Sequence, residues 1–203
     1  NYFNQCLDAG YYYEGGEVFA KLSDIYNNTD RKDAARDILE KGFVEFPQSQ
    51  SILIGLINYY LESKQSPDRL FELIGEAKKN EPTNASLYYV EGNIYNELGQ
   101  KDKAVESYYK CHEINPEYEF GYIGAGILYY DLAIELQEKA SNEFDDKKYN
   151  ALVEEFEQAL KNALEPFEKA YAISKDNQLK VSIAEYLKNI YYRFYSNGPE
   201  YEA

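Results

Sequence analysis

The only histidine of the 203-residue chain, His112, stands between Cys111 and Glu113. A cysteine and a histidine together can form a nucleophile with its base, or two ligands of a zinc ion. Adjacent side chains on a helix point in different directions, so either site needs further groups from elsewhere in the chain. The sequence has no paired-cysteine motif, no triad signature and no glycine-rich phosphate loop to supply them. We therefore expect no catalytic residue, no metal and no cofactor, and we interpret His112 as an exposed helix position.

Clustered carboxylates suggest a hard cation such as calcium, which prefers oxygen ligands. The spacing and the central glycine of an EF-hand loop are absent, so we interpret these acids as a polar turn and as solvated helix faces. The acids in question are Glu143, Asp145, Asp146, Glu154, Glu155 and Glu157. The two cysteines, Cys6 and Cys111, are interpreted as buried small side chains, too far apart for a disulfide.

The formal net charge is −15, from 36 acidic and 21 basic residues. This field repels phosphate backbones and anionic lipids, so we expect neither a nucleic acid nor a membrane as partner. The chain also has no run of about 18 apolar residues for membrane insertion. A basic or neutral protein partner fits the charge, although an acidic excess also serves solubility. The chain lacks Met and opens on helix-like residues, so we expect it to be a piece of a longer protein.

The elements that carry these residues recur with a fixed period. Pro47, Pro82 and Pro116 are 35 and 34 residues apart, and each follows a stretch with helical hydrophobic periodicity. The clearest copy, residues 85–118, places small, large and turn residues in one phase. They are Tyr88, Gly92, Tyr95, Gly99, Ala104, Tyr108, Cys111 and Pro116.

This pattern resembles the tetratricopeptide repeat, a unit of 34 residues that forms a pair of antiparallel helices. We expect 1–15 to be the end of a truncated repeat and 16–50, 51–84 and 85–118 to be regular repeats. Residues 119–175 then form a repeat with a 25-residue helical insertion, which we expect to project as a hairpin, and 176–197 form a capping helix. Pro166 predicts a kink or break near residues 163–165.

The resemblance implies an all-α fold: a right-handed superhelix of helix pairs, forming one solenoid over 1–203 with an extended helical hairpin near the C-terminus. The insertion is similar to that of bacterial tetratricopeptide proteins often made with an export signal. This likeness suggests the periplasmic side of a bacterial cell envelope, with the cytoplasm as the alternative. Oligomeric state stays open.

The resemblance also implies a concave groove lined by the first helix of each repeat. By repeat, these positions are Glu17, Ala20, Asp24 and Asn27; Ile52, Gly55, Tyr59 and Glu62; Ser86, Tyr89, Asn93 and Asn96; and Phe120, Ile123, Ile127 and Tyr130. We expect a non-catalytic scaffold that binds a peptide or helix of another protein in this groove. Two alternatives stay open: a carbohydrate or other non-protein ligand stacked on the groove tyrosines, or a structural arm in a larger envelope assembly. The tyrosines themselves fit either a contact or a packing role.

Overall fold

The computed structural model of the chain describes residues 5, 9–10, 12, 14–63 and 66–195. Cys6 and most of segment 1–15 lie outside the described residues, as do the last two residues of the predicted capping helix. The described part is all helical, which confirms the all-α fold class. Its elements are η1 (Glu14–Gly16), α2 (Glu17–Asn28), α3 (Lys32–Glu45), α4 (Gln50–Ser63), α5 (Pro67–Asn80), α6 (Ala85–Glu97), α7 (Lys101–Ile114), α8 (Glu119–Ser141), α9 (Asp146–Ile173) and α10 (Asn177–Tyr195).

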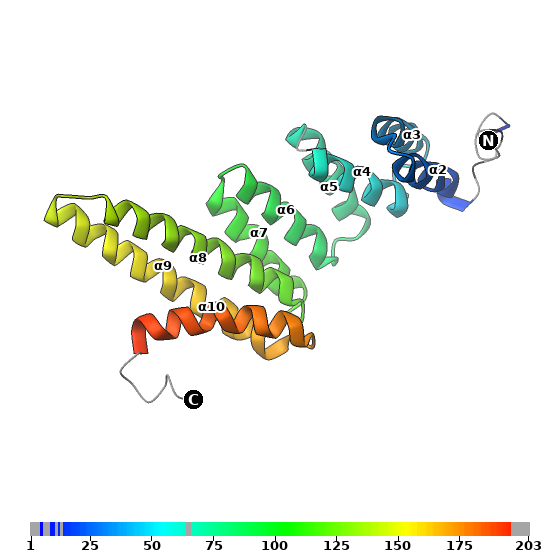
Figure 1. Cartoon of the computed structure of the whole chain (residues 1–203). Coiled ribbons are helices and arrows are strands. Elements are labelled where there is room, and N and C mark those ends of the chain that lie inside the picture. The colour runs from blue at the N-terminus through cyan, green and yellow to red at the C-terminus, as the bar shows by residue number, and fades with distance from the viewer. Residues whose placement is uncertain (1–4, 6–8, 11, 13, 64–65, 196–203) are drawn as a thin grey trace. The chain divides into compact units, whose positions relative to one another are not determined.

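The chain divides into two compact units, residues 1–87 and 88–203, which are described separately below. The prediction of one continuous solenoid over 1–203 therefore stays a prediction. Within each unit, consecutive helices pack against each other as pairs (Figure 1).

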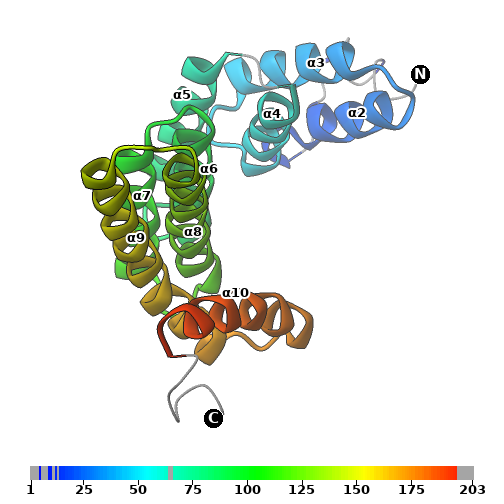
Figure 2. The same ribbon diagram turned by 60° about the vertical axis from the view of Figure 1, so that its left-hand side comes forward.

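In unit 1, α2 packs against α3 and α4, and α4 packs against α5 (Figure 2). Among the described residues of this unit, the buried core is aliphatic apart from Phe19. The apolar residues of each helix recur at helical spacing, so they lie on one face. Gly42 lets α2 and α3 approach closely, since a Cβ at this position would lie 2.7 Å from the Phe19 ring. Pro67 opens α5 at a position where its missing N–H costs nothing, and Lys78 and Lys79 complement the negative end of the helix dipole.

In unit 2, the small and large residues that recur in the repeat pack directly against each other. The buried Tyr108 ring of α7 lies against Gly92 of α6 and Gly124 of α8, where an added Cβ would come within 2.5 and 2.6 Å of it. Gly126 of α8 faces the Phe167 ring of α9 in the same way, at 2.7 Å. These glycines let four helices, α6 to α9, pack closely around two large aromatic side chains.

The long helices α8 and α9 have 23 and 28 residues, against 13 and 14 for α6 and α7. They run side by side as a hairpin whose tip lies beyond the loop joining α6 to α7 (Figure 1). The expected break near Pro166 is wrong, because α9 continues through it to Ile173, and the alternative, a kink, stays a prediction. Pro166 and Phe167 are both buried, so packing along α9 holds the helix together where one backbone hydrogen bond is missing.

Candidate functional site

A depression of about 320 Å³ lies in unit 1 between α2, α3 and α4. We call it the unit 1 groove. Six of the residues assigned to the groove by repeat phase line it: Ala20, Asp24, Asn27, Gly55, Tyr59 and Glu62. Ser23, Lys32, Ala35, Arg36, Leu39, Ser51 and Asn58 complete its wall. Most of these side chains are polar, so the site suits a ligand rich in hydrogen-bonding groups.

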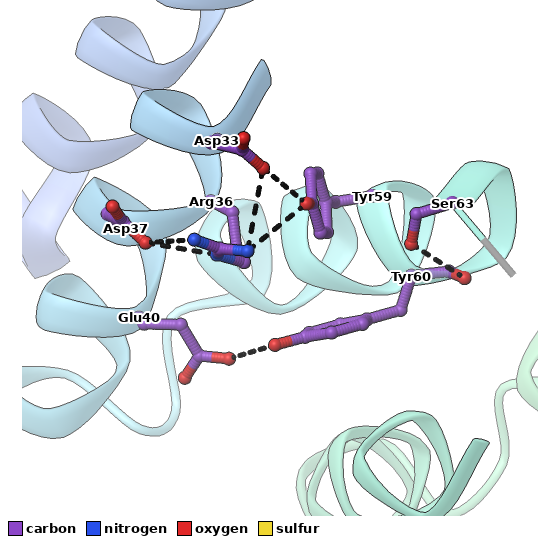
Figure 3. Close-up of polar contacts among 7 residues, drawn as sticks. All are labelled: Asp33, Arg36, Asp37, Glu40, Tyr59, Tyr60 and Ser63. Atoms are coloured by element: carbon purple, nitrogen blue, oxygen red, sulfur yellow. Dashed lines mark hydrogen bonds and ion pairs between the residues drawn. The ribbon is translucent and has the colours of Figure 1, made fainter. Parts of the chain in front are cut away.

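Tyr59 is held on the groove wall by a network with α3 (Figure 3). Its hydroxyl donates to Asp33 at 3.0 Å and accepts from Arg36 Nη1 at 3.3 Å. Arg36 in turn pairs with Asp37 at 2.6 Å, and its guanidinium lies 5.5 Å from the centre of the Tyr59 ring. Burial, together with the hydrogen bond to Asp33, raises the pKa of Tyr59, and the hydrogen bond to Asp37 raises that of Arg36. The phenol therefore stays neutral, and its position is set before any ligand arrives.

A second set of contacts joins α3, α4 and α5 beside this network. Glu40 accepts from Tyr60 at 2.9 Å, as Figure 3 shows, and from Arg69 Nη2 at 2.6 Å. Burial and the hydrogen bond to Glu40 raise the pKa of Tyr60, while the same carboxylate raises that of Arg69. These bonds fix α4, the helix that carries Tyr59, against α3, and they also fix α5 against α3.

Three polar side chains of the unit 1 groove lack such contacts with the described residues. Among the described residues, Asp24, Asn27 and Asn58 have no side-chain hydrogen bond or ion pair, and all three are exposed. Lys32 and Glu62 form a pair at 3.1 Å, but both side chains are largely exposed, so the pair is weak. The groove thus offers one free carboxylate and two free amides to a ligand.

The predicted groove residue Ser86 of α6 belongs to unit 1, whereas Tyr89, Asn93 and Asn96 of α6 and Phe120 of α8 form a different surface in unit 2. Tyr89 lies 5.9 Å from Phe120 and 6.0 Å from Tyr108, measured between ring centres. Asn93 accepts a hydrogen bond from the Tyr108 hydroxyl at 2.8 Å, so its carbonyl oxygen is already engaged. Asn96 is half-buried on the same helix. This surface is an aromatic cluster that partly serves packing.

Four further predicted groove residues pack inward. Ile123 is 8% exposed and belongs to the core of unit 2, and Ile52 is fully buried in unit 1, so neither faces a ligand. Both lie at positions where neighbouring helices converge. Ile127 and Tyr130 are half-buried against the unit 2 core. Tyr130 also contacts the Tyr186 ring of α10 at 5.0 Å and accepts from Asn189 at 3.2 Å, so it helps to anchor α10.

The sequence prediction missed Lys32 and Arg36, because it assigned the groove to first helices alone. Both belong to α3, a second helix, and long side chains carry their charges to the groove wall. The spacing of Asp33 and Arg36, one turn apart, was the available signal. It indicates an ion pair on one helix face but not the tyrosine across from it.

The interpretation of His112 as an exposed position is wrong. Its ring stacks on Tyr122 of α8 at 3.5 Å and meets Tyr109 edge-on. The Nε2 atom is buried beside Gly121 and has no well-formed hydrogen bond to a described residue. Gly121 lacks a Cβ, and this opens the space into which α7 places the imidazole. Cys111 is buried, as predicted.

We expect the stability of the chain to fall as pH drops below about 6.5, the ordinary pKa of histidine. Burial, aided by the charge of Lys169, lowers the pKa of His112, while the Gly121 backbone opposes the shift. The unfolded chain then binds the proton more tightly, so the stabilisation present above pH 6.5 is lost as pH falls through the folded-state pKa. Urea unfolding at pH 7.5 and 5.5 checks this. His112→Phe keeps a stacked ring that does not titrate, and an equal pH dependence in this variant would contradict the prediction.

Within the described part of the chain, no group of His, Cys, Asp or Glu side chains is arranged to hold a metal ion. Over the same residues, no helix combines the length and the apolar character needed to cross a bilayer.

Residues 85–118 match the tetratricopeptide repeat family. A TPR repeat-containing protein of Methanocaldococcus jannaschii is 44% identical over 63 residues, a region that spans 30% of this chain and only 11% of that relative. The fold is similar to that of MamA, with TM-score 0.56 and 23% identity over 82% of this chain and 85% of that one. It is also similar to YrrB, a TPR protein with an unusual peptide-binding site, with TM-score 0.51 and 16% identity over 91% and 98%. A tetratricopeptide repeat protein from Parabacteroides merdae gives TM-score 0.53 and 15% identity over 88% and 73%. Residues 85–118 thus match a tetratricopeptide repeat, and the helical-repeat fold of the chain is similar to that of solved tetratricopeptide-repeat proteins.

Proposed function

We propose that the unit 1 groove binds an extended segment of another protein and that the chain acts as a non-catalytic scaffold. Tetratricopeptide-repeat folds generally serve as scaffolds for protein interactions. The observation that carries the finer proposal is the set of free groups at the groove: Asp24, Asn27 and Asn58, beside the fixed Tyr59. Amide side chains can both donate to and accept from a peptide backbone, and Tyr provides contact area at little entropic cost.

The charge of the groove indicates which peptides fit. Arg36 pairs with Asp33 and Asp37, and Lys32 pairs with Glu62, so Asp24 is the charged residue of the groove wall that has no ion pair to a described residue. A peptide with a basic side chain opposite Asp24 gains a favourable charge contact, which the net charge of −15 reinforces at long range. A free terminal carboxylate has no unpaired cation to meet in this groove.

The alternative functions, carbohydrate binding and a structural arm, have less support. A carbohydrate needs exposed aromatic faces, whereas Tyr59, Tyr89 and Tyr130 each already contact another side chain. YrrB is described as having an unusual peptide-binding site, which favours peptide as the ligand class for this fold. The structural arm and the envelope location stay predictions from the resemblance.

Asn27→Ala is expected to weaken peptide binding about 2- to 10-fold, the effect of losing one net hydrogen bond. Peptides selected by this chain from a random library, then titrated by fluorescence anisotropy, provide the measurement. Asn28→Ala is the matched control, because Asn28 is the next residue of α2, is also exposed and does not line the groove. Equal affinities for the two variants, or selected peptides that bind a chain carrying Asn27→Ala and Asn58→Ala at full strength, would place binding elsewhere.

A further inference from the structure

The tip of the α8–α9 hairpin presents a phenyl ring almost entirely to solvent. Phe144 is 97% exposed, more than any other large apolar side chain among the described residues. The turn around it is well bonded: Glu143 Oε1 accepts from the backbone N–H groups of Phe144 and Asp145, both at 2.9 Å. Asp145 caps α9 by accepting from the N–H groups of Lys147 and Lys148 at 3.1 and 3.0 Å. The ring is therefore displayed on a fixed backbone.

The same unit contains a depression that suits such a ring. It has a volume of about 200 Å³ and lies where α8, α9 and the end of α10 meet. One part of its wall is apolar, formed by Ala140, Tyr149, Val153 and Phe156, and the other part is polar, formed by Gln137, Ser141 and Arg193. A protein cavity of about 150 Å³ can hold a benzene molecule, so the volume is sufficient for one phenyl group.

We propose that two copies of this chain associate through their hairpins, with Phe144 of each copy seated in the depression of the other. Charge complements shape in this arrangement. Phe144 is flanked in sequence by the carboxylates Glu143 and Asp145, and the depression carries Arg193. Arg193 pairs with Glu157 at 2.9 Å and remains about half exposed, so its fork of donors has room for a second carboxylate.

Two-fold symmetry makes the two contacts between tip and depression equivalent. Val153 and Phe156 lie 7 and 10 residues beyond Asp146, the first residue of α9. At 1.5 Å per residue, the depression is therefore roughly 10–15 Å from the tip along the helix. When one tip overlaps the other hairpin to that depth, the second tip reaches the same depth on the first. Both contacts form together, which gives a closed dimer in place of a filament.

The association should be weak. Two phenyl contacts bury much less surface than the roughly 1,200–2,000 Å² of a stable interface, and two chains of charge −15 repel each other. Salt at about 0.15 M, where the Debye length is about 8 Å, screens much of this repulsion.

Sedimentation equilibrium of the full chain, from about 10 μM to about 1 mM, tests the proposal over the range expected for weak binding. The wild-type chain should form a dimer as its concentration rises. Phe144→Ser removes the ring and Val153→Trp fills the depression, so each should lower the association constant about tenfold or more. Val181→Ser is the control, because it removes an apolar side chain that is 63% exposed on α10, outside the depression, and should leave association unchanged. A wild-type chain that stays monomeric throughout, or a Phe144→Ser chain that dimerises normally, overturns the proposal.

A disulfide trap tests the predicted pairing itself. A chain with Phe144→Cys and Val153→Cys, in a Cys6→Ser background, is mixed as light and ¹⁵N-labelled protein and oxidised. The proposal requires mixed-isotope peptides that join position 144 of one chain to position 153 of the other, because a disulfide forms only within about 7 Å between Cα atoms. A chain with Phe144→Cys and Val181→Cys is the matched control. Links between chains that join 144 to 181 as often as 144 to 153 would overturn the assigned contact.

Discussion

Replacing Phe167 with Ala is expected to lower the free energy of unfolding of unit 2 by about 3–5 kcal/mol, the usual cost of removing a buried aromatic ring. Phe167 is 0% exposed and stacks on the Tyr186 ring of α10 at 4.7 Å with an angle of 11°. Another neighbour is Gly126 of α8, which has no side chain to fill the space left behind. The cavity would therefore open where α8, α9 and α10 meet, and three helices would lose contact together.

Urea unfolding followed by circular dichroism measures this loss. Phe144→Ala is the matched control, because it removes the same ring from a position that is 97% exposed. Its effect should stay within about 0.5 kcal/mol, as for other surface changes. Hydrogen exchange localises the effect: amides of α8, α9 and α10 should lose protection in Phe167→Ala. Equal stabilities of the two variants would show that Phe167 does not join these helices.

Replacing Tyr108 with Ala is expected to cost about 3–5 kcal/mol, whereas Tyr108→Phe should cost only about 0.5–1.5 kcal/mol. Tyr108 is 2% exposed, and its ring lies against Gly92 and Gly124. Burial raises the pKa of Tyr108, so the group stays a neutral phenol that donates to Asn93 at 2.8 Å. Ala removes the ring and leaves Asn93 unpaired, while Phe keeps the packing and removes only the hydrogen bond.

Unfolding experiments on both variants separate these two contributions. Asn93→Ala removes the acceptor and should resemble Tyr108→Phe, because each variant loses the same bond. Tyr108→Phe combined with Asn93→Ala should then be less destabilising than the sum of the single effects. A large loss in Tyr108→Phe, comparable to that of Tyr108→Ala, would mean that the hydrogen bond and not the ring holds these helices together.

The repeat in residues 85–118 was predictable because it depends on local properties. Gly92 and Ala104 are small, Tyr108 is large and Pro116 ends the unit, and these features return at nearly constant spacing. Side chains in fixed phase on consecutive helices must meet, so a one-dimensional pattern predicts a contact in space. The long hairpin was predictable from the same spacing, because two amphipathic helical segments joined by a short polar stretch bury their apolar faces by packing against each other.

Ile123 and Ile127 show that the repeat phase does not predict how deeply a residue is buried. They lie four residues apart on one face of α8, yet Ile123 is buried in the core while Ile127 is only half-buried. Ile123 belongs to the core that α8 shares with α9 and α10, whereas Ile127 packs against that core from its margin. Periodicity defines a face of a helix but not how far a neighbour extends along it.

By itself, the sequence determined the all-helical repeat and the phase in which small and large residues such as Gly92 and Tyr108 recur, because these depend on residues near in sequence. Only the tertiary structure decided which groups remain free for a ligand. Arg36 and Tyr59 are 23 residues apart, and their bond exists because α3 and α4 pack side by side. Asp24, Asn27 and Asn58 stay free because, within the described part of the chain, no packed helix gives them a partner. Composition specifies which charges a chain carries, but only packing determines which of them compensate one another.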